Sequence, residues 1–190
     1  MARLIIGVTG RMGSGKSTLR RVLEEHGFPG YDCDARAKAI MLTDEFSTVL
    51  AGLFGSDAIL NGQLNKPFIA SLIFEDAGLR HELESDLMPF LLRDFLLWES
   101  GTSSTAVVLE SAIMFRSCLN LLCDIVYEVQ VSDETRMARI KLRNPDWTDG
   151  QTAARLQAGE KDFPGAVSVS NEDGSESILP QLNLPLFGLA

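Results

Sequence analysis

A run of glycine, lysine and serine near the start of the chain has the spacing of a phosphate-binding loop. The segment Gly10-Arg11-Met12-Gly13-Ser14-Gly15-Lys16-Ser17 fits GxxxxGK(S/T) without a gap. Glycines let successive backbone N–H groups converge on one anion, and a helix beginning near Lys16 adds its positive dipole end. Lys16 is expected to reach the β- and γ-phosphates and Ser17 to ligate Mg²⁺. The sequence therefore predicts a site for a nucleoside triphosphate with Mg²⁺, made by Arg11, Met12, Gly13, Ser14, Gly15, Lys16, Ser17 and Thr18.

Acidic residues stand at the end of a short segment and at the end of an expected strand. Asp32 and Asp34 follow a short segment after the loop's helix, and Glu110 closes the apolar run 106–109. The carboxyl ends of parallel strands line the ligand crevice of such sheets. Acids there can orient magnesium and accept a proton from an attacking hydroxyl. We predict Ser17, Asp32 and Glu110 as metal ligands, although each acid alone also fits an ordinary turn or strand end.

Three arginines recur at helical spacing in the second half of the chain. Arg136, Arg139 and Arg143 lie at i, i+3 and i+7, which places them on one helix face. Like charges gathered in this way favour an anion nearby, and the alternative is a solvated charged face. Asn144-Pro145-Asp146 then breaks the helix, and a second helix follows. This pattern predicts a lid that excludes water from a transferring phosphate.

The elements that must position these residues alternate between strand and helix. Apolar runs at 3–8, 106–110 and 125–131 predict buried strands, and 167–170 predicts a short last strand. Helical patterns cover 16–26, 133–143, 151–160 and 79–99, the last with an interruption at Pro89, and the tail from Gly174 predicts one more helix. Strands alternating with helices predict an α/β fold with a parallel sheet.

Length and charge limit the classes of partner. The chain has 190 residues, of which 45% are hydrophobic, so one domain with a sizeable core is expected. Its 26 acids and 17 bases give a net charge of −9, which disfavours binding to nucleic acids or anionic membranes. No stretch approaches the ~20 apolar residues of a membrane span. The cysteines, Cys33, Cys118 and Cys123, have no metal-site spacing and predict reduced thiols, so we expect a cytoplasmic protein.

With these residues in view, the chain resembles the dephospho-CoA kinases. The resemblance is carried by Ile6 through Thr18, by Asp32-Cys33-Asp34-Ala35-Arg36, by Gly62-Gln63-Leu64-Asn65-Lys66 and by Asn171-Glu172-Asp173-Gly174-Ser175. It implies transfer of the γ-phosphate of ATP, with Mg²⁺, to the ribose 3′-hydroxyl of dephospho-CoA. By the same resemblance, Lys16, Asp34, Arg139 and Arg143 are the catalytic candidates, and Asp32, Asp34 and Lys66 are the acceptor-binding ones.

The resemblance also implies an architecture. It is a three-layer P-loop NTPase fold in a single domain, 1–190, with a parallel sheet. The expected core comprises 1–58, 99–135 and 161–190. A helical acceptor-binding region is expected at 59–98 and a helical lid at 136–160.

The departures from the family pattern lie mostly on the acceptor side. The family's His-Pro is Met88-Pro89 here, its "PLLFE" corresponds to Ala112 through Arg116, and its arginine after "GxL" is Lys66. Two other readings therefore stay open: a P-loop kinase acting on another nucleoside or nucleotide, and a non-catalytic relative that binds ATP. A switch GTPase is disfavoured because the chain has no guanine-reading NKxD motif.

Overall fold

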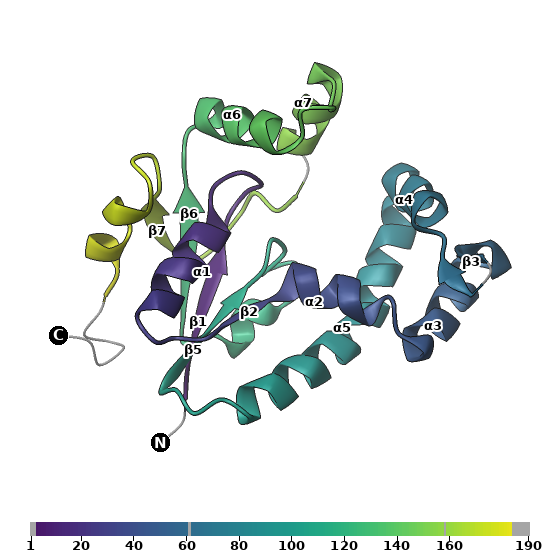
Figure 1. Ribbon diagram of the computed structural model, residues 1–190, viewed down its shortest axis with the longest axis horizontal. Coiled ribbons are helices and arrows are strands. Elements are labelled where there is room, and N and C mark those ends of the chain that lie inside the picture. Colours follow the sequence, from purple (N-terminus) through teal and green to yellow (C-terminus); the bar gives the residue numbers. More distant parts are fainter. Residues whose placement is uncertain (1–2, 61, 158, 184–190) are drawn as a thin grey trace. The chain divides into compact units, whose positions relative to one another are not determined.

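The computed structural model describes residues 3–60, 62–157 and 159–183, and it divides the chain into two compact units (Figure 1). The first unit combines residues 1–32 with 102–190, and the second spans residues 33–101. The predicted acceptor-binding region, 59–98, falls inside the second unit, which begins earlier, at Cys33. The predicted lid, 136–160, falls inside the first.

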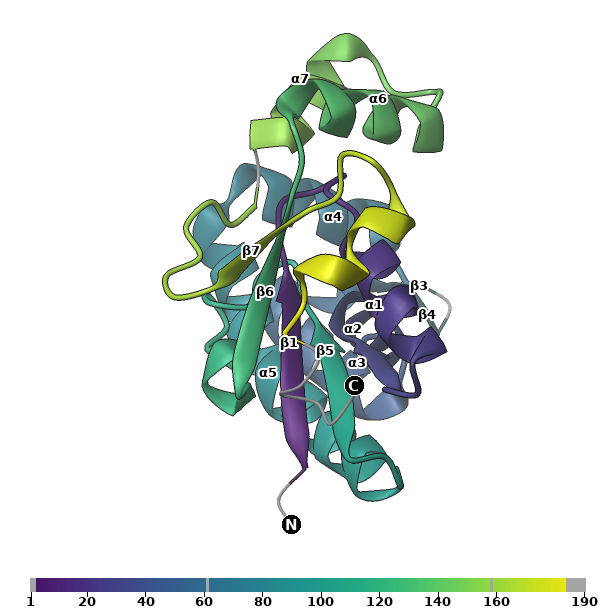
Figure 2. The ribbon, with the colours of Figure 1, turned by 90° about the vertical axis from the view of Figure 1, so that its left-hand side faces the viewer.

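The first unit is built on a parallel sheet, as predicted. Its strands stand in the order β2-β5-β1-β6-β7, and every neighbouring pair runs parallel. Figure 2 shows β5, β1, β6 and β7 of this sheet. The strands are β1 (Leu4–Thr9), β2 (Gly30–Asp32), β5 (Ala106–Glu110), β6 (Ile125–Gln130) and β7 (Val167–Ser170). Every residue of β5 is buried, which explains its uninterrupted apolar sequence. The register places Glu110 opposite both Asp32 and Val8, so the ends of β1, β2 and β5 meet at one edge.

Helices of the first unit frame this edge. Helix α1 (Lys16–Glu25) packs on β1, β2 and β5 through its apolar stripe, with Leu19 and Leu23 fully buried. After β6, α6 (Asp133–Arg143) and α7 (Asp149–Gln157) pack against each other and form the predicted helix–turn–helix (Figure 1). Short 3-10 helices complete the unit: η2 (Leu119–Leu122), η3 (Ser175–Ser177) and η4 (Leu179–Gln181). The bounds of β1, β5, β6, β7, α1 and α6 therefore follow the sequence pattern closely.

The second unit is mostly helical. It comprises α2 (Cys33–Ile40), α3 (Asp44–Phe54), η1 (Ser56–Ala58), a small hairpin of β3 (Ile59–Leu60) and β4 (Gln63–Leu64), α4 (Lys66–Glu75) and α5 (Ala77–Ser100). Helices α2, α3 and α4 all pack against α5. Helix α4 begins at Lys66, where the side chain of Asn65 accepts a hydrogen bond from the Phe68 N–H.

Two expectations about helices were wrong. Helix α5 is not interrupted at Pro89 but continues through it from Ala77 to Ser100. Packing outweighs the lost backbone hydrogen bond, since Leu83, Leu91 and Phe95 are buried and Phe90 meets Phe46 edge-on at 5.2 Å. The tail from Gly174 forms η3 and η4 instead of one helix, because Pro180 has no N–H with which to continue the ladder. Residues 184–190 of that tail lie outside the described residues.

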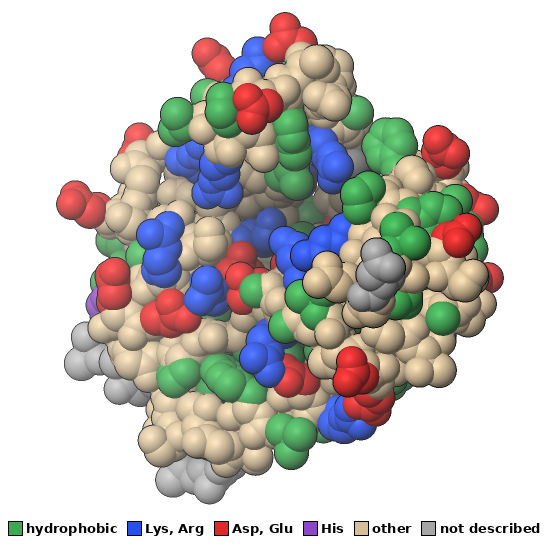
Figure 3. Space-filling model, turned by 45° about the vertical axis from the view of Figure 1, so that its right-hand side comes forward, with side chains coloured by type: hydrophobic (Ala, Val, Ile, Leu, Met, Phe, Trp, Pro, Cys, Tyr) green, Lys and Arg blue, Asp and Glu red, His purple; other side chains and the backbone are tan. Residues whose placement is uncertain are grey.

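The described surface mixes charges of both signs. Figure 3 shows basic, acidic and apolar side chains interspersed on one face of the molecule. In the second unit, Arg93 and Glu45 form an exposed ion pair at 2.7 Å. Among the described residues, no helix is both long and apolar enough to span a bilayer.

Candidate active site

The phosphate loop, Gly10–Thr18, has the backbone that its glycines were predicted to permit. Gly10 and Gly15 adopt φ values of +139° and +98°, which side-chain-bearing residues rarely reach. Space is also restricted: a Cβ on Gly15 would lie 2.0 Å from Nδ2 of Asn171, and one on Gly10 would lie 2.6 Å from the carbonyl oxygen of Val129. Glycine is therefore required at both positions for conformational and for steric reasons.

The residues with the chemistry follow in the first turn of α1. Gly15 is the N-cap, and Lys16, Ser17 and Thr18 open the helix. The first N–H groups of a helix have no partner within it, so this end carries a partial positive charge. The ammonium of Lys16 donates to the carbonyl oxygen of Gly10 at 3.1 Å, which folds its side chain back over the loop. From this position the ammonium of Lys16 can bind a phosphate that enters the loop.

The carbonyl groups of the loop are bound from behind by side chains of the same unit. Ser14 O accepts hydrogen bonds from Arg139 Nη1 at 3.2 Å and from Asn171 Nδ2 at 2.9 Å. Met12 O accepts one from Arg136 Nε at 2.9 Å. When backbone N–H groups converge on an anion, carbonyl groups must point elsewhere and need donors. These three side chains supply donors and hold the loop open for its ligand.

The structure separates the three predicted lid arginines by burial. Arg136 is 1% exposed, Arg139 is half-buried and Arg143 is exposed in the last turn of α6. Arg139 also donates to the carbonyl oxygen of Asn171 at 2.8 Å. The face carrying Arg136 and Arg139 is thus directed at the phosphate loop, and both guanidinium groups bind backbone carbonyls. The catalytic roles of Arg139 and Arg143 stay predictions.

The predicted acids at the strand ends lie beside an arginine that the sequence did not single out. Arg20, on α1, donates from Nε to Glu110 at 2.7 Å and from Nη1 to Glu24 at 2.7 Å, and its Nη2 lies 3.8 Å from Asp32. Burial raises the pKa of the Glu110 carboxyl, which is 7% exposed, and the hydrogen bond from Arg20 opposes that shift. Arg20 therefore balances two neighbouring carboxylates at the sheet edge.

The oxygen-rich edge suits a hard cation only in combination with a nucleotide. Within the described residues, no group of three or more His, Cys, Asp or Glu could hold a metal by itself. The hydroxyl of Ser17 and the carboxylates of Asp32 and Glu110 are donors of the type that Mg²⁺ prefers. The buried hydroxyl oxygens of Thr9 and Ser14 at the same loop have no hydrogen-bond partner within the described residues. This donor set fits a magnesium ion that phosphate oxygens also bind.

The acceptor-binding candidates other than Asp32 belong to the second unit. Asp34 is exposed in the first turn of α2, two residues after β2 ends. Lys66 is exposed at the start of α4, directly before Pro67. Both side chains stand at helix starts on the surface of that unit, where they can be reached by a ligand.

Sequence reasoning missed the roles of three residues: Arg20, Arg136 and Asn171. The spacing of Arg20 and Glu24, at i and i+4, was a signal for an ion pair but not for its link to Glu110. Asn171 stood in the C-terminal pattern noted above, with no role attached to it. Its contact with Ser14 spans 157 positions of the chain, and nothing local in the sequence indicates such a contact.

Comparison with known proteins supports the same reading. Residues 4–162 match the family model described as dephospho-CoA kinase. A dephospho-CoA kinase from Porphyromonas gingivalis is 38% identical over 81% of this chain and 74% of its own length. A second, from Trichormus variabilis, is 28% identical over 98% of both chains.

Solved structures agree on the fold. A crystal structure of a Thermus thermophilus protein superposes with a TM-score of 0.83 and 26% identity, and the match covers 100% of both chains. A dephospho-CoA kinase from Campylobacter jejuni shares the fold with a TM-score of 0.55 at 18% identity, over 90% of each chain. The parallel sheet, the phosphate loop and the match of residues 4–162 together show that the chain belongs to the dephospho-CoA kinase family.

Proposed function

We propose that this enzyme transfers the γ-phosphoryl group of ATP to the ribose 3′-hydroxyl of dephospho-CoA, giving coenzyme A and ADP. The observation that carries the proposal is the phosphate loop, in which Gly10 and Gly15 hold positive φ angles directly before α1. That conformation is built for the phosphates of a nucleotide. The acceptor, dephospho-CoA, is assigned from membership of the family.

In the proposed reaction, the loop N–H groups and Lys16 hold the β- and γ-phosphates. The acceptor oxygen attacks the γ-phosphorus, the bond to the β,γ-bridging oxygen breaks, and ADP leaves. Asp34 accepts the proton of the attacking hydroxyl. Arg139 and Arg143 are proposed to stabilise charge on the transferring group.

Magnesium would be held by Ser17 with the phosphate oxygens, and the carboxylates of Asp32 and Glu110 would lie nearby. Bound in this way, the ion neutralises charge that develops on the β- and γ-phosphates. Lys66 is proposed to bind the acceptor, for which its ammonium offers a cation without the bidentate geometry of arginine.

The direct test mixes the purified protein with ATP, Mg²⁺ and dephospho-CoA, and follows ADP and coenzyme A. We expect coenzyme A at a turnover on the order of 1 s⁻¹ or above. Variant Asp34→Asn serves as the matched control, because it should retain ATP binding while losing transfer. Transfer to other nucleosides or nucleotides but not to dephospho-CoA would overturn the acceptor assignment. Transfer that persists in Asp34→Asn would overturn the role of Asp34.

A further inference from the structure

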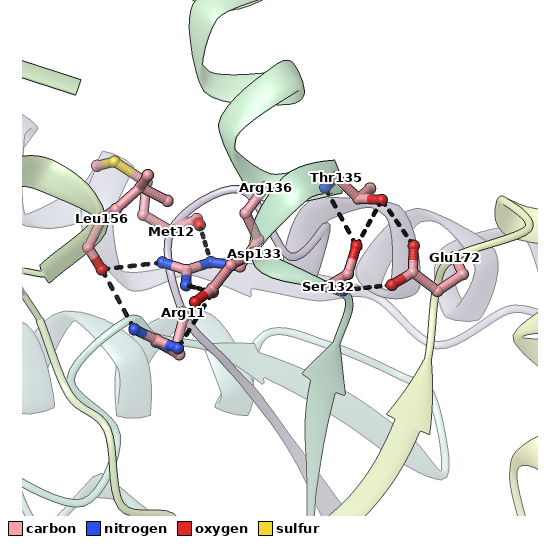
Figure 4. Close-up of polar contacts among 8 residues, drawn as sticks. All are labelled: Arg11, Met12, Ser132, Asp133, Thr135, Arg136, Leu156 and Glu172. Atoms are coloured by element: carbon pink, nitrogen blue, oxygen red, sulfur yellow. Dashed lines mark hydrogen bonds and ion pairs between the residues drawn. The ribbon is translucent and has the colours of Figure 1, made fainter. Parts of the chain in front are cut away.

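Arg136 is an arginine buried almost completely beside the phosphate loop. Its side chain is 2% exposed. Within the described residues its one carboxylate partner is Asp133, whose Oδ1 lies 2.5 Å from Arg136 Nη1 and whose side chain is 69% exposed. Burying a guanidinium is costly unless its donors are satisfied. Arg136 satisfies them with Asp133, with Met12 O at 2.9 Å and with Leu156 O at 3.1 Å (Figure 4).

The two carbonyl groups that Arg136 binds belong to different parts of the unit. Met12 lies in the phosphate loop, and Leu156 lies in the last turn of α7. Carbonyl groups at a helix C-terminus lack partners within the helix and carry its negative dipole end, so they attract a cation. The planar guanidinium presents donors in several directions and can bind both carbonyls at once. A single side chain on α6 thus connects the loop to the far helix of the lid segment.

Other contacts reinforce this connection. Arg11, in the loop itself, contacts two of the three acceptors that Arg136 binds. Its Nη2 lies 3.3 Å from Leu156 O and its Nη1 lies 3.3 Å from Asp133 Oδ1 (Figure 4). The loop backbone also lies close to α6, because a Cβ on Gly13 would be 3.0 Å from the carbonyl oxygen of Arg136. On the other side of α6, Glu172 accepts hydrogen bonds from the backbone N–H of Ser132 and from the hydroxyl of Thr135. The start of α6 is therefore fixed from two sides.

We propose that Arg136 is a positioning residue for ATP: by binding Met12 O and Leu156 O together, it holds the phosphate loop and the α6–α7 segment in the arrangement that binds the triphosphate. The inference rests on the proposed function only in that ATP occupies the loop. Arg136 acts through the loop backbone and is not assigned any contact with substrate. Its removal takes the side-chain donor from Met12 O, leaves Leu156 O with the longer contact from Arg11 at 3.3 Å, and removes one of the three side chains that support the loop from behind.

The test measures ATP affinity without any acceptor, by calorimetry with Mg·ATP, for the unmutated protein, Arg136→Met and Arg136→Lys. Arg136→Met should weaken ATP binding about 10-fold or more, equivalent to ~1.4 kcal/mol. Arg136→Lys retains the charge but reaches one carbonyl at a time, so it should fall between the two. In steady-state assays the KM for ATP should rise while the KM for dephospho-CoA stays the same. A general loss of folding would not produce that split.

Asp149→Asn is the matched control. It breaks an exposed contact between the same two helices, Lys141 Nζ to Asp149 Oδ1 at 2.7 Å, without touching the loop. We expect its ATP affinity to be unchanged. The proposal is overturned if folded Arg136→Met binds ATP as the unmutated protein does, or if Asp149→Asn loses as much affinity.

If Arg136→Met does not fold, Arg136→Lys decides, and unchanged ATP affinity in that variant refutes the proposal. The proposed function is judged separately. A protein that binds ATP in this Arg136-dependent way but forms no coenzyme A would contradict the acceptor assignment alone.

Discussion

The phosphate loop and the acceptor-binding candidates differ in how firmly the chain holds them. Around the loop, Ser14 is 1% exposed and Asn171 is 2% exposed, and the carbonyls of Met12 and Ser14 are bound by side chains from α6 and the C-terminal segment. In the second unit, Asp34 and Lys66 are exposed at helix starts. The phosphate loop is thus held by buried contacts, whereas Asp34 and Lys66 lie on the surface of the second unit.

The departures from the family pattern lie outside the loop. The loop retains every position of its motif, while Met88 and Lys66 in the second unit and Ala112 through Arg116 in the first depart from the family pattern. A preorganised site tolerates little change, because each substitution disturbs buried polar contacts that several residues share. An exposed binding surface can change one residue at a time. Substitutions around the loop should therefore affect ATP binding and stability, and substitutions of Asp34 or Lys66 should affect acceptor chemistry alone.

The two largest effects are expected from variants of the proposed catalytic groups, of which Lys16→Met is the first. Removing the ammonium that reaches the β- and γ-phosphates should lower kcat/KM by about 10²–10³-fold or more, since a preorganised charge at the reacting group is lost. Steady-state rates with ATP and dephospho-CoA measure this. Lys38→Met, at an exposed position in the last turn of α2, is the matched control and should retain normal rates. Equal losses of kcat/KM in both variants would contradict the proposed role of Lys16 in binding the phosphates.

Asp34→Asn should separate phosphoryl transfer from ATP binding most clearly. We expect kcat to fall by roughly 10²–10⁴-fold, the range for loss of a general base, with the dissociation constant for ATP unchanged. Single-turnover rates and calorimetry with Mg·ATP give the two quantities. Weakened ATP binding in this variant would show that the acceptor side also supports the nucleotide.

Arg20→Met tests the buried charges at the sheet edge. Glu110 would keep its charge without its cation, so the free energy of unfolding should fall by about 2–4 kcal/mol at neutral pH. Burial already raises the pKa of Glu110, and protonation at low pH abolishes the unpaired charge. The deficit should therefore shrink as the pH falls through that pKa, as urea unfolding at several pH values would measure.

Arg93→Met is the control for that experiment, because it breaks an exposed pair with Glu45 in the second unit. Exposed pairs contribute little to stability, so we expect no measurable change. A comparable loss in Arg93→Met would mean that burial does not distinguish the two regions.

The smallest effect is expected from Lys66→Ala. An exposed ammonium that binds one acceptor group should raise the KM for dephospho-CoA by about 5–10-fold, equivalent to ~1 kcal/mol. The KM for ATP should not change. A change in the KM for ATP alone would contradict the assignment of Lys66 to acceptor binding.

Local patterns predicted the sheet and the conformation of the glycine loop because each carries its own physical signature. The uninterrupted apolar runs specify strands buried on both faces, and the motif from Gly10 to Ser17 specifies an anion-binding turn whatever surrounds it. The predicted interruption at Pro89 was wrong because packing decided the structure there. A local penalty at one residue was outweighed by packing of Leu83, Leu91 and Phe95, which the local sequence around the proline does not reveal.

By itself, the sequence determined that a glycine-rich loop with a phosphate-binding motif lies between a buried strand and a helix, and which family's pattern the chain follows. Only the tertiary structure decided the partners of Arg20, Arg136 and Asn171. Their contacts join residues 90, 124 and 157 positions apart. Hydrogen bonds of this kind depend on which strands are neighbours and where helices cross the loop, and those relations arise only when the whole core packs.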